Sequence, residues 1–303
     1  MEISLMGFVL AAVSGLSLSL IGIAFRLGQS KNVVPLHIAT SMGICGMIFF
    51  GVQMDWGLMK EIPLFIYGLA LINALGQIVA MELTKASLKR GPLSPVWCAL
   101  NLNFLVVIIY AAVVYQEAVH LFQALALVSG LLCVVAASNL ENEDGGDGKE
   151  SALKDKILYG LMLIIILFSN SIVFLTIRDL GSRMVPGDVV SYLGKYLPNI
   201  YFILYAMMAL VCGTVVSFQK IKPESTGTLI RLGLMGGVGS IAGLFLLSLC
   251  APYPAAFVFT INGMITILAG ALASVFFFGE KRTTAWYFTI GFGILAVILA
   301  NLK

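Results

Sequence analysis

The stretch Gly91–Leu140 reads GPLSPVWCALNLNFLVVIIYAAVVYQEAVHLFQALALVSGLLCVVAASNL. Most of its pattern returns in Ala251–Leu302, which reads APYPAAFVFTINGMITILAGALASVFFFGEKRTTAWYFTIGFGILAVILANL. Each copy begins with a proline-containing segment, continues through an apolar stretch that carries asparagine, and breaks at Glu117 or Glu280. A second apolar stretch follows each glutamate. An internal duplication of hydrophobic helices is a signature of transporter folds.

The composition predicts an integral membrane protein. Hydrophobic residues make up 60% of the 303 residues and charged residues 11%, and the mean hydropathy is +1.01. A soluble domain carries about 25% charged residues, so this chain lacks the polar side chains to cover its own surface. The 5 cysteines lie singly in apolar segments without CxxC spacing, which favours packing over a metal or redox role.

Ten segments are apolar over the roughly 20 residues that a spanning helix needs. They are Ile3–Leu27, Val34–Gln53, Ile62–Leu88, Pro92–Tyr115, Val119–Ser138, Ile157–Ile177, Val189–Phe218, Leu229–Leu249, Pro254–Phe278 and Thr284–Leu302. The first of these is too long for a signal peptide and has no basic segment before it, so we expect a retained helix.

An acidic, glycine-rich linker at 141–155 divides the chain into two predicted five-helix repeats, 1–140 and 156–303. Further matches between the repeats are Gly7 with Gly160, Arg26 with Arg178, Gly76 with Gly239, and Gly130 with Gly293. Because five is an odd number, consecutive copies enter the membrane from opposite sides. The predicted fold is therefore an all-α membrane protein of ten helices arranged as inverted repeats.

The charges of the loops predict the orientation. Thirteen Lys and Arg residues fall on the side of the odd-to-even connections, and four fall on the opposite side. The positive-inside rule places the first side in the cytoplasm. We therefore expect a multi-pass protein of the cell (inner) membrane with both termini outside the cytoplasm.

A further pattern consists of Gly91–Pro95, the turn Gly279–Arg282, and Gly291 and Gly293 in the last segment. In these residues the sequence resembles the drug/metabolite transporter superfamily, specifically its EamA-type ten-helix members. Gln116-Glu117 matches the same turn in the first half but lacks the usual glycine. The resemblance covers nearly the whole chain. It implies a central cavity lined by the first, third, fourth, sixth, eighth and ninth segments, with the second and seventh as further candidates and the fifth and tenth at the periphery.

Ionisable side chains deep in an apolar span are costly, so they are candidates for function. Glu82 and Lys195 are of this kind, each about 9 to 10 Å from a membrane face. We expect them to face the cavity, where Glu82 would meet a cationic group of the substrate and Lys195 an anionic one. The alternative is that Glu82 pairs with Lys85 and that Lys195 extends to the surface.

Uncharged polar side chains complete the predicted substrate site. Trp97 and Asn101 lie four residues apart and so share a helix face, which suits a flat or cationic solute. The alternative is a packed tryptophan beside an amide that bonds a neighbouring helix. The remaining candidates are Gln77, Ser17, Asn170, Tyr192, Tyr196 and Asn262.

The sequence contains no Walker motif, no HExxH, no GxSxG and no Cys/His ligand spacing. We therefore predict no enzyme, no cofactor and no metal, and we exclude an ATP-driven pump. Glu117 and Glu280 are interpreted as carboxylates at helix N-termini. The expected partners are a small-molecule substrate, a proton as candidate coupling ion, and the lipid bilayer. Nucleic acid is not an expected partner, and the expected oligomeric state is a monomer or a weak dimer.

The leading interpretation is a secondary active transporter that moves a small polar organic solute, such as an amino acid or related metabolite, by alternating access. One alternative is a proton-coupled transporter of an organic cation or nucleobase-like ring, with Glu82 as the titrating group and Trp97 as the stacking surface. An intramembrane enzyme or lipid-handling protein is the third interpretation. It would need a His/Asp/Ser cluster on one face, which the sequence lacks.

Overall fold

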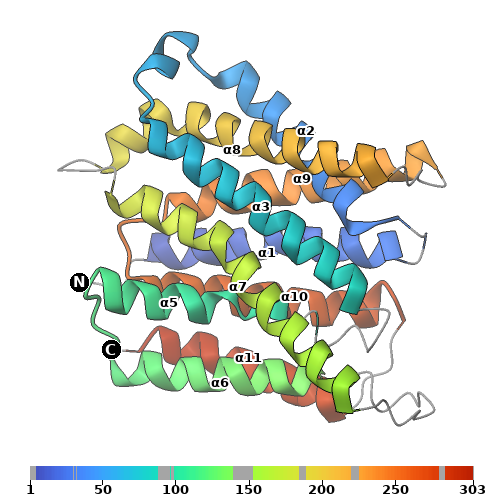
Figure 1. The fold of residues 1–303 in the computed structure, drawn as a ribbon. Helices are drawn as coiled ribbons and strands as arrows, with labels where there is room; N and C mark the ends of the chain where they lie inside the picture. The colour runs from blue at the N-terminus through green and yellow to red at the C-terminus, as the bar shows by residue number, and fades with distance from the viewer. Residues whose placement is uncertain are drawn as a thin grey trace.

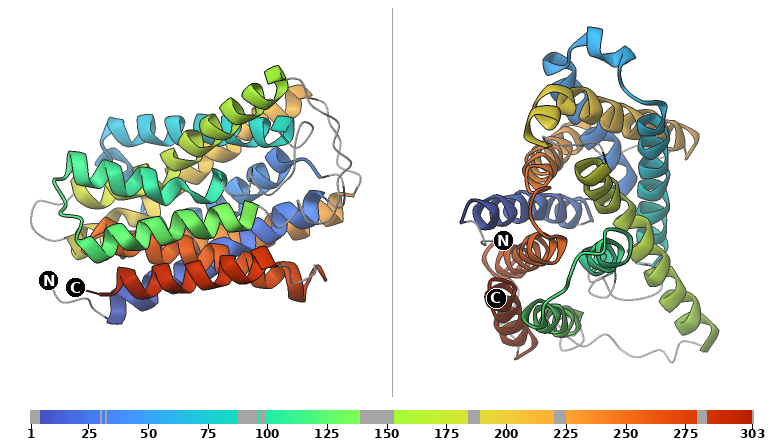
Figure 2. Two further views of the ribbon diagram at one scale, coloured as in Figure 1. Left: turned by 90° about the horizontal axis from the view of Figure 1, so that it is seen from below. Right: turned by 90° about the vertical axis from the view of Figure 1, so that its left-hand side faces the viewer.

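The computed structural model describes residues 5–29, 31, 33–87, 96, 99–138, 153–183, 189–219, 225–279 and 284–302. Across these ranges the chain is helical, without strands. The helices are α1 (Leu5–Gln29), α2 (Pro35–Gln53), the short 3-10 helix η1 (Trp56–Lys60), α3 (Leu64–Ser87), α5 (Asn103–Val114), α6 (Leu121–Ser138), α7 (Leu153–Arg183), α8 (Val189–Gln219), α9 (Thr226–Ser248), α10 (Ala255–Phe276) and α11 (Thr284–Ala300). Figures 1 and 2 show that they form one bundle with both ends of the chain at the same end.

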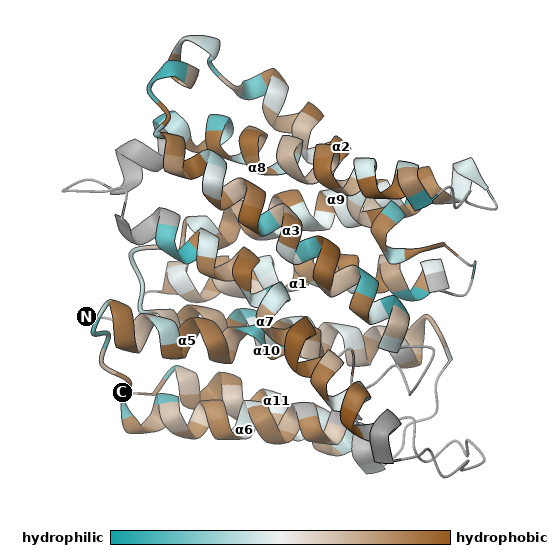
Figure 3. Ribbon diagram, viewed as in Figure 1, coloured by the Kyte–Doolittle hydropathy of each residue, from teal (hydrophilic) through white to brown (hydrophobic). Residues whose placement is uncertain are grey.

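Within the described residues, 7 helices are long and apolar enough to cross a membrane, and the helices around α5, α6 and α11 are apolar but shorter. The bundle also has an apolar outer surface, on which Val52, Leu64 and Phe218 are each more than 80% exposed. Hydrophobic residues extend along most of the length of α5, α6 and α11 (Figure 3). Water-soluble proteins do not expose apolar surface on this scale. The prediction of a multi-pass, all-α membrane protein is confirmed.

Local sequence chemistry sets several of the helix ends. Pro35 occupies the first turn of α2, where its missing N–H costs no hydrogen bond. The Ser225 hydroxyl accepts the N–H of Thr228 (3.3 Å) at the beginning of α9. Most of the predicted segments agree with the observed helices to within a few residues.

The segment predicted at Pro92–Tyr115 is helical in its described residues 96, 99–101 and 103–114, but a turn at Leu102 interrupts it just before α5. The side chain of Asn103 donates a hydrogen bond to the carbonyl oxygen of Leu100 (2.9 Å). A short amide side chain that bonds the main chain in this way competes with regular helix formation. The residues before this turn lie largely outside the described ranges.

The turns after α5 and α10 share an uncommon backbone conformation. Gln116 has φ 56° and Gly279 has φ 67°, both in the left-handed region. Glycine enters that region freely, whereas other residues rarely do. The first-half turn therefore has the glycine-like conformation although its residue is glutamine. The side-chain amide of Gln116 donates to the carbonyl oxygen of Val113 (2.8 Å), which helps to hold the turn.

The helices of each half pack mainly on helices of the other half. α1 packs against α9 and α10, while α7 packs against α3 and α5. α2 packs against α8 and α9, and α8 in turn also packs against α3. α6 lies along α11 at one edge of the bundle (Figures 1 and 2). These contacts thus include three exchanged pairs: α1 on α9 with α7 on α3, α1 on α10 with α7 on α5, and α2 on α9 with α8 on α3.

Glycines allow the closest of these crossings. A Cβ atom on Gly239 of α9 would lie 2.6 Å from the carbonyl oxygen of Ser17 in α1, too close for any side chain. In the exchanged contact, a Cβ atom on Gly76 of α3 would lie 3.0 Å from the carbonyl oxygen of Ser169 in α7. Small residues that bring helix backbones together in this way are typical of membrane helix packing.

Candidate functional site

A cavity of about 130 Å³ lies inside the bundle. Described residues of, or immediately before, α1, α2, α3, α5, α7, α8, α9 and α10 line it, whereas α6 and α11 contribute none of the described lining residues. Many of the lining residues lie well inside their helices, as Gln77 in α3 and Ser240 in α9 illustrate, whereas Asn101 and Asn103 lie at or just before the beginning of α5. The cavity is therefore formed jointly by both halves.

Amide side chains dominate the polar part of the lining. They are Asn73, Gln77, Asn101, Asn103, Asn170 and Asn262. Tyr201, Tyr205, Ser240 and Thr266 add hydroxyl groups. Among the described lining residues, none is an aspartate, glutamate, lysine, arginine or histidine. The cavity thus offers hydrogen bonds to a ligand without offering it a counter-charge.

Asn262 lies on α10 with its side chain directed at α1. Its Nδ2 atom donates to the hydroxyl of Ser14 (2.8 Å) and lies 3.5 Å from the carbonyl oxygen of Ala11. The Ser14 hydroxyl itself donates to the carbonyl oxygen of Gly243 in α9 (2.7 Å). The amide is buried, with 3% of its surface exposed, so this chain of bonds fixes its orientation.

Asn170 of α7 contacts the residues just before α5. Its Nδ2 atom donates to the carbonyl oxygen of Leu100 (2.7 Å), the same oxygen that accepts from Asn103. One main-chain carbonyl at the break before α5 therefore positions two of the lining amides. Interrupted helices at a central cavity are a recurring feature of transporter binding sites.

Two tyrosines of α8 form an aromatic wall. The ring of Phe50 in α2 stacks on Tyr201 (centroids 5.0 Å apart) and on Tyr205 (5.8 Å). The hydroxyl of Tyr201 donates to the carbonyl oxygen of Leu244 (2.6 Å), and the hydroxyl of Tyr205 shares a hydrogen bond with Ser240 (2.8 Å). Stacking and hydrogen bonds together hold both rings in place.

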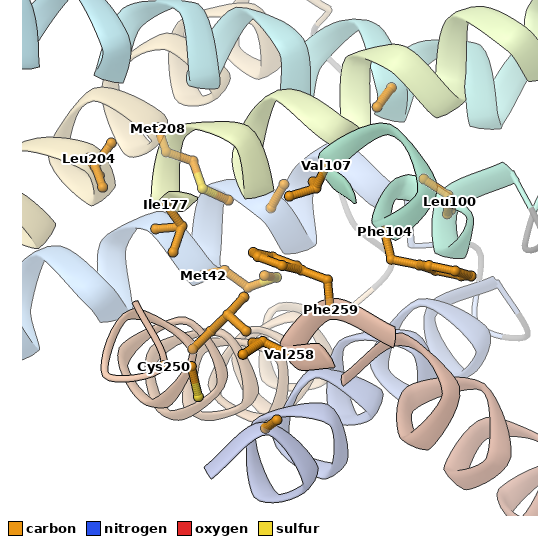
Figure 4. Close-up of a cluster of buried hydrophobic side chains, with 14 of the residues drawn as sticks. Met42, Leu100, Phe104, Val107, Ile177, Leu204, Met208, Cys250, Val258 and Phe259 are labelled. Carbon is orange, nitrogen blue, oxygen red and sulfur yellow. The ribbon is translucent and has the colours of Figure 1, made fainter. Parts of the chain in front are cut away.

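The apolar part of the lining continues into the hydrophobic core. Met42, Ile177 and Met208, from α2, α7 and α8, lie together in the cluster of Figure 4 and also line the cavity. Methionine side chains adapt their shape to a neighbour more readily than branched residues. This wall can therefore accommodate ligands of somewhat different shapes.

Many lining positions correspond between the two halves. If Arg26 is aligned with Arg178, then Leu18, Ile21, Gly22 and Phe25 of α1 fall opposite Asn170, Val173, Phe174 and Ile177 of α7, and all eight line the cavity. If Gly76 is aligned with Gly239, then Gln77 and Met81 fall opposite Ser240 and Leu244. The shape of the site thus follows the sequence repeat, while its chemistry differs between the halves.

Four of the predicted site residues line the cavity. They are Gln77, Asn101, Asn170 and Asn262. Ser17 lies on α1 outside the described lining and donates to the carbonyl oxygen of Val13 (2.9 Å), one helical turn back. Trp97 and the side chain of Tyr192 lie outside the described residues.

The two ionisable candidates lie elsewhere. Glu82 accepts a hydrogen bond from the Gln219 amide of α8 (2.9 Å) and is not among the described lining residues. Lys195 lies 3.6 Å from the carboxylate of Glu61 and donates to the hydroxyl of Tyr196 (3.0 Å), with its side chain 55% exposed. Tyr196 in turn donates to Glu61. Lys195 thus extends to the surface, as its alternative interpretation predicts, and Tyr196 lies beside it.

Asn73, Tyr201, Tyr205, Ser240 and Thr266 line the cavity although the sequence did not single them out. A signal existed for one of them. Asn73 lies four residues before Gln77 and therefore shares its face of α3. The tyrosines resemble ordinary core residues in sequence, because only the fold brings Phe50 and Ser240 against them.

A buried ionic cluster lies at one end of α7. The guanidinium of Arg178 pairs with Glu117 and lies over the ring of Tyr115 (5.7 Å to the centroid). The Glu117 carboxylate also accepts the N–H of Ala255 (2.7 Å). From the sequence, Glu117 is expected at the N-terminus of the next helix along the chain, α6. Its carboxylate in fact bonds the N-terminus of α10. Arg26 lies over the ring of Phe278 (5.6 Å) at the corresponding position of the other half.

No protein-family model matches this sequence, and no curated protein is significantly similar to it. A solved structure described only as "Crystal structure of protein" is similar over 97% of this chain and 96% of its own, with a TM-score of 0.66 and 12% sequence identity. At that identity the likeness establishes a shared fold and carries no information about substrate.

Proposed function

We propose that the protein is a secondary active transporter of the ten-helix EamA type, which moves a small polar organic solute across the cell (inner) membrane by alternating access. The observation that carries the proposal is the central cavity, to which both halves contribute corresponding positions. Transporters built from inverted repeats bind their substrates where the repeats meet, near the middle of the membrane.

Three further observations support the proposal. α6 and α11 lie outside the cavity, as the resemblance to EamA-type proteins implies. The largest contacts between the halves come in exchanged pairs or join corresponding helices, which is what a pseudo-two-fold axis through the bundle would produce. Both ends of the chain lie at the same end of the bundle (Figure 2), as an even number of crossings requires. Inverted five-helix repeats would account for all three.

The mechanism follows from this geometry. A solute bound between the halves is released to one side when the two bundles of helices rock about it, and to the other side when they rock back. At close backbone crossings such as Gly239 on Ser17, the glycine contributes no side chain that would oppose a change in crossing angle. The amides of the cavity hold the solute in both states.

The test begins with a thermal-shift screen of the purified protein against a metabolite library. Compounds that raise the unfolding temperature are then assayed for uptake into proteoliposomes. We expect at least one of them to be taken up, and we expect Asn170→Leu to lower the rate of its uptake. Asn301→Leu is the matched control, because Asn301 also bonds a main-chain carbonyl (Val297, 2.7 Å) but directly follows α11, away from the cavity. Stabilising compounds that never cross the membrane would contradict transport.

A further inference from the structure

The cavity is polar without being charged. Its described lining provides six amides and four hydroxyls but no ionisable acid or base other than the tyrosines. An ion that leaves water for such a site loses its hydration without gaining a counter-ion, which is strongly unfavourable. An uncharged polar solute loses only hydrogen bonds to water, and the amides can replace these.

The orientation of two amides follows from chemistry alone. A carbonyl oxygen can only accept hydrogen bonds, so the atoms of Asn103 and Asn170 that lie 2.9 and 2.7 Å from the Leu100 oxygen must be the nitrogens. The Oδ1 atoms of both side chains are therefore turned away from Leu100. Neither Oδ1 atom has a hydrogen bond to another described residue.

The same reasoning applies to Asn262. The Ser14 hydroxyl uses its single proton on Gly243, so toward Asn262 it can only accept, and the atom 2.8 Å from it must be Nδ2. Its Oδ1 atom likewise lacks a hydrogen bond among the described residues. Three carbonyl oxygens from α5, α7 and α10 are thus available as fixed acceptors.

Several of the donors that the lining might offer are already in use. The Tyr201 hydroxyl donates to Leu244 (2.6 Å), and the Thr266 hydroxyl lies 2.8 and 3.1 Å from the carbonyl oxygens of Asn262 and Gly15. A carboxylate or phosphate, which needs several donors, is poorly matched to this lining. Asn73 and Gln77 can present either end of their amides to a ligand.

We propose that the cavity selects a solute without charged groups that donates N–H or O–H hydrogen bonds to the Oδ1 atoms of Asn103, Asn170 and Asn262. The inference rests on the proposed function, since it takes the cavity as the transport site. It narrows the substrate to amides, polyols and nucleobase-like rings. It also separates the site from Glu82 and Lys195, on which a zwitterionic substrate would depend.

The test uses sets of compounds that share a skeleton and differ in charge at pH 7. The sets are uracil with orotate, ribitol with ribonate, and nicotinamide with nicotinate and the cation 1-methylnicotinamide. Binding of each radiolabelled compound to the purified protein is measured by equilibrium dialysis. We expect a neutral member of at least one set to bind at least about tenfold more tightly than its charged relatives. Equal or tighter binding of the charged members, or no binding by any neutral member, would overturn the proposal.

Variants locate the binding. Asn170→Leu should weaken the binding of the neutral member about fivefold, the effect of one lost hydrogen bond, whereas Asn301→Leu should leave it unchanged. Equal effects of the two changes would also overturn the proposal. Asn170→Leu could disturb the fold, but the charge selectivity of the wild-type protein does not depend on any variant.

Uptake into proteoliposomes separates this inference from the proposed function. A neutral compound that binds but is not transported would refute transport and leave the selectivity of the cavity standing. A charged compound that is transported through the cavity, with neutral ones excluded, would uphold transport and refute the selectivity.

Discussion

The carboxylate of Glu117 and the guanidinium of Arg178 form an ion pair that joins the end of α7 to the turn after α5. The pair is mostly shielded from solvent, with the two side chains 21% and 9% exposed. Because the same carboxylate receives the N–H of Ala255, one residue links three helices of the bundle.

Glu117→Gln should destabilise the protein. It removes the negative charge opposite a buried guanidinium, which typically costs about 3 kcal/mol. The unfolding temperature in detergent provides the measurement. Glu61→Gln is the matched control, because the Glu61–Lys195 pair is exposed on both sides and should contribute nothing measurable. Equal shifts of the unfolding temperature in the two variants would show that burial does not make the Glu117–Arg178 pair more stabilising than the Glu61–Lys195 pair.

Gly239→Ala should also destabilise the protein, because its methyl group would lie 2.6 Å from the Ser17 carbonyl oxygen and would force α1 and α9 apart. We expect a loss of about 1 to 3 kcal/mol, seen as a lower unfolding temperature. Gly291→Ala in α11 provides the contrast. A Cβ atom there meets nothing within 4 Å, so the change should be neutral or slightly stabilising. A similar loss for both variants would rule out the crossing as the cause.

Two positions on α3 should respond differently in a transport assay. Gln77→Leu removes a polar group from the cavity and should lower the rate of uptake at least tenfold. Glu82→Gln keeps the shape of a side chain that contacts Gln219, and it should leave uptake and its pH dependence near the wild-type level. Loss of uptake in Glu82→Gln, with wild-type uptake in Gln77→Leu, would show that the substrate site includes Glu82 and not Gln77.

The charge distribution of the loops predicts that both termini lie outside the cytoplasm. A C-terminal fusion to a protein that fluoresces only in the cytoplasm should therefore stay dark. A fusion to an enzyme that is active only outside the cytoplasm should be active. Bright fluorescence of the first fusion would reverse the predicted orientation.

The positions of the helices could be predicted because the thickness of a bilayer fixes the length of an apolar span. The sequence repeat likewise indicated which residues correspond, and the left-handed conformation of Gln116 agrees with its match to Gly279. These features depend on local pattern, which a single sequence contains.

The composition of the site was predictable only in part, because depth in the membrane does not reveal the face of a helix. Gln77 and Glu82 lie five residues apart, which places them about 140° apart around α3. Gln77 therefore lines the cavity while Glu82 meets α8. Lys195 has a long side chain and reaches the surface, which a short residue at the same depth could not do. Which face points inward depends on neighbours that come from the other half of the chain.

The exchanged contacts between the halves have a consequence for biosynthesis. α1, α2 and α3 leave the ribosome long before α7, α8 and α9, which are their main neighbours in the finished bundle. Until the second half is made, the early helices lack these neighbours. Their polar faces and glycine surfaces must then be covered by lipid or by chaperones of the insertion machinery. A fragment that ends after α6 should be degraded when expressed alone and should persist when the complementary fragment is supplied as a separate chain. The second half of the chain thus supplies the packing neighbours that the helices of the first half need.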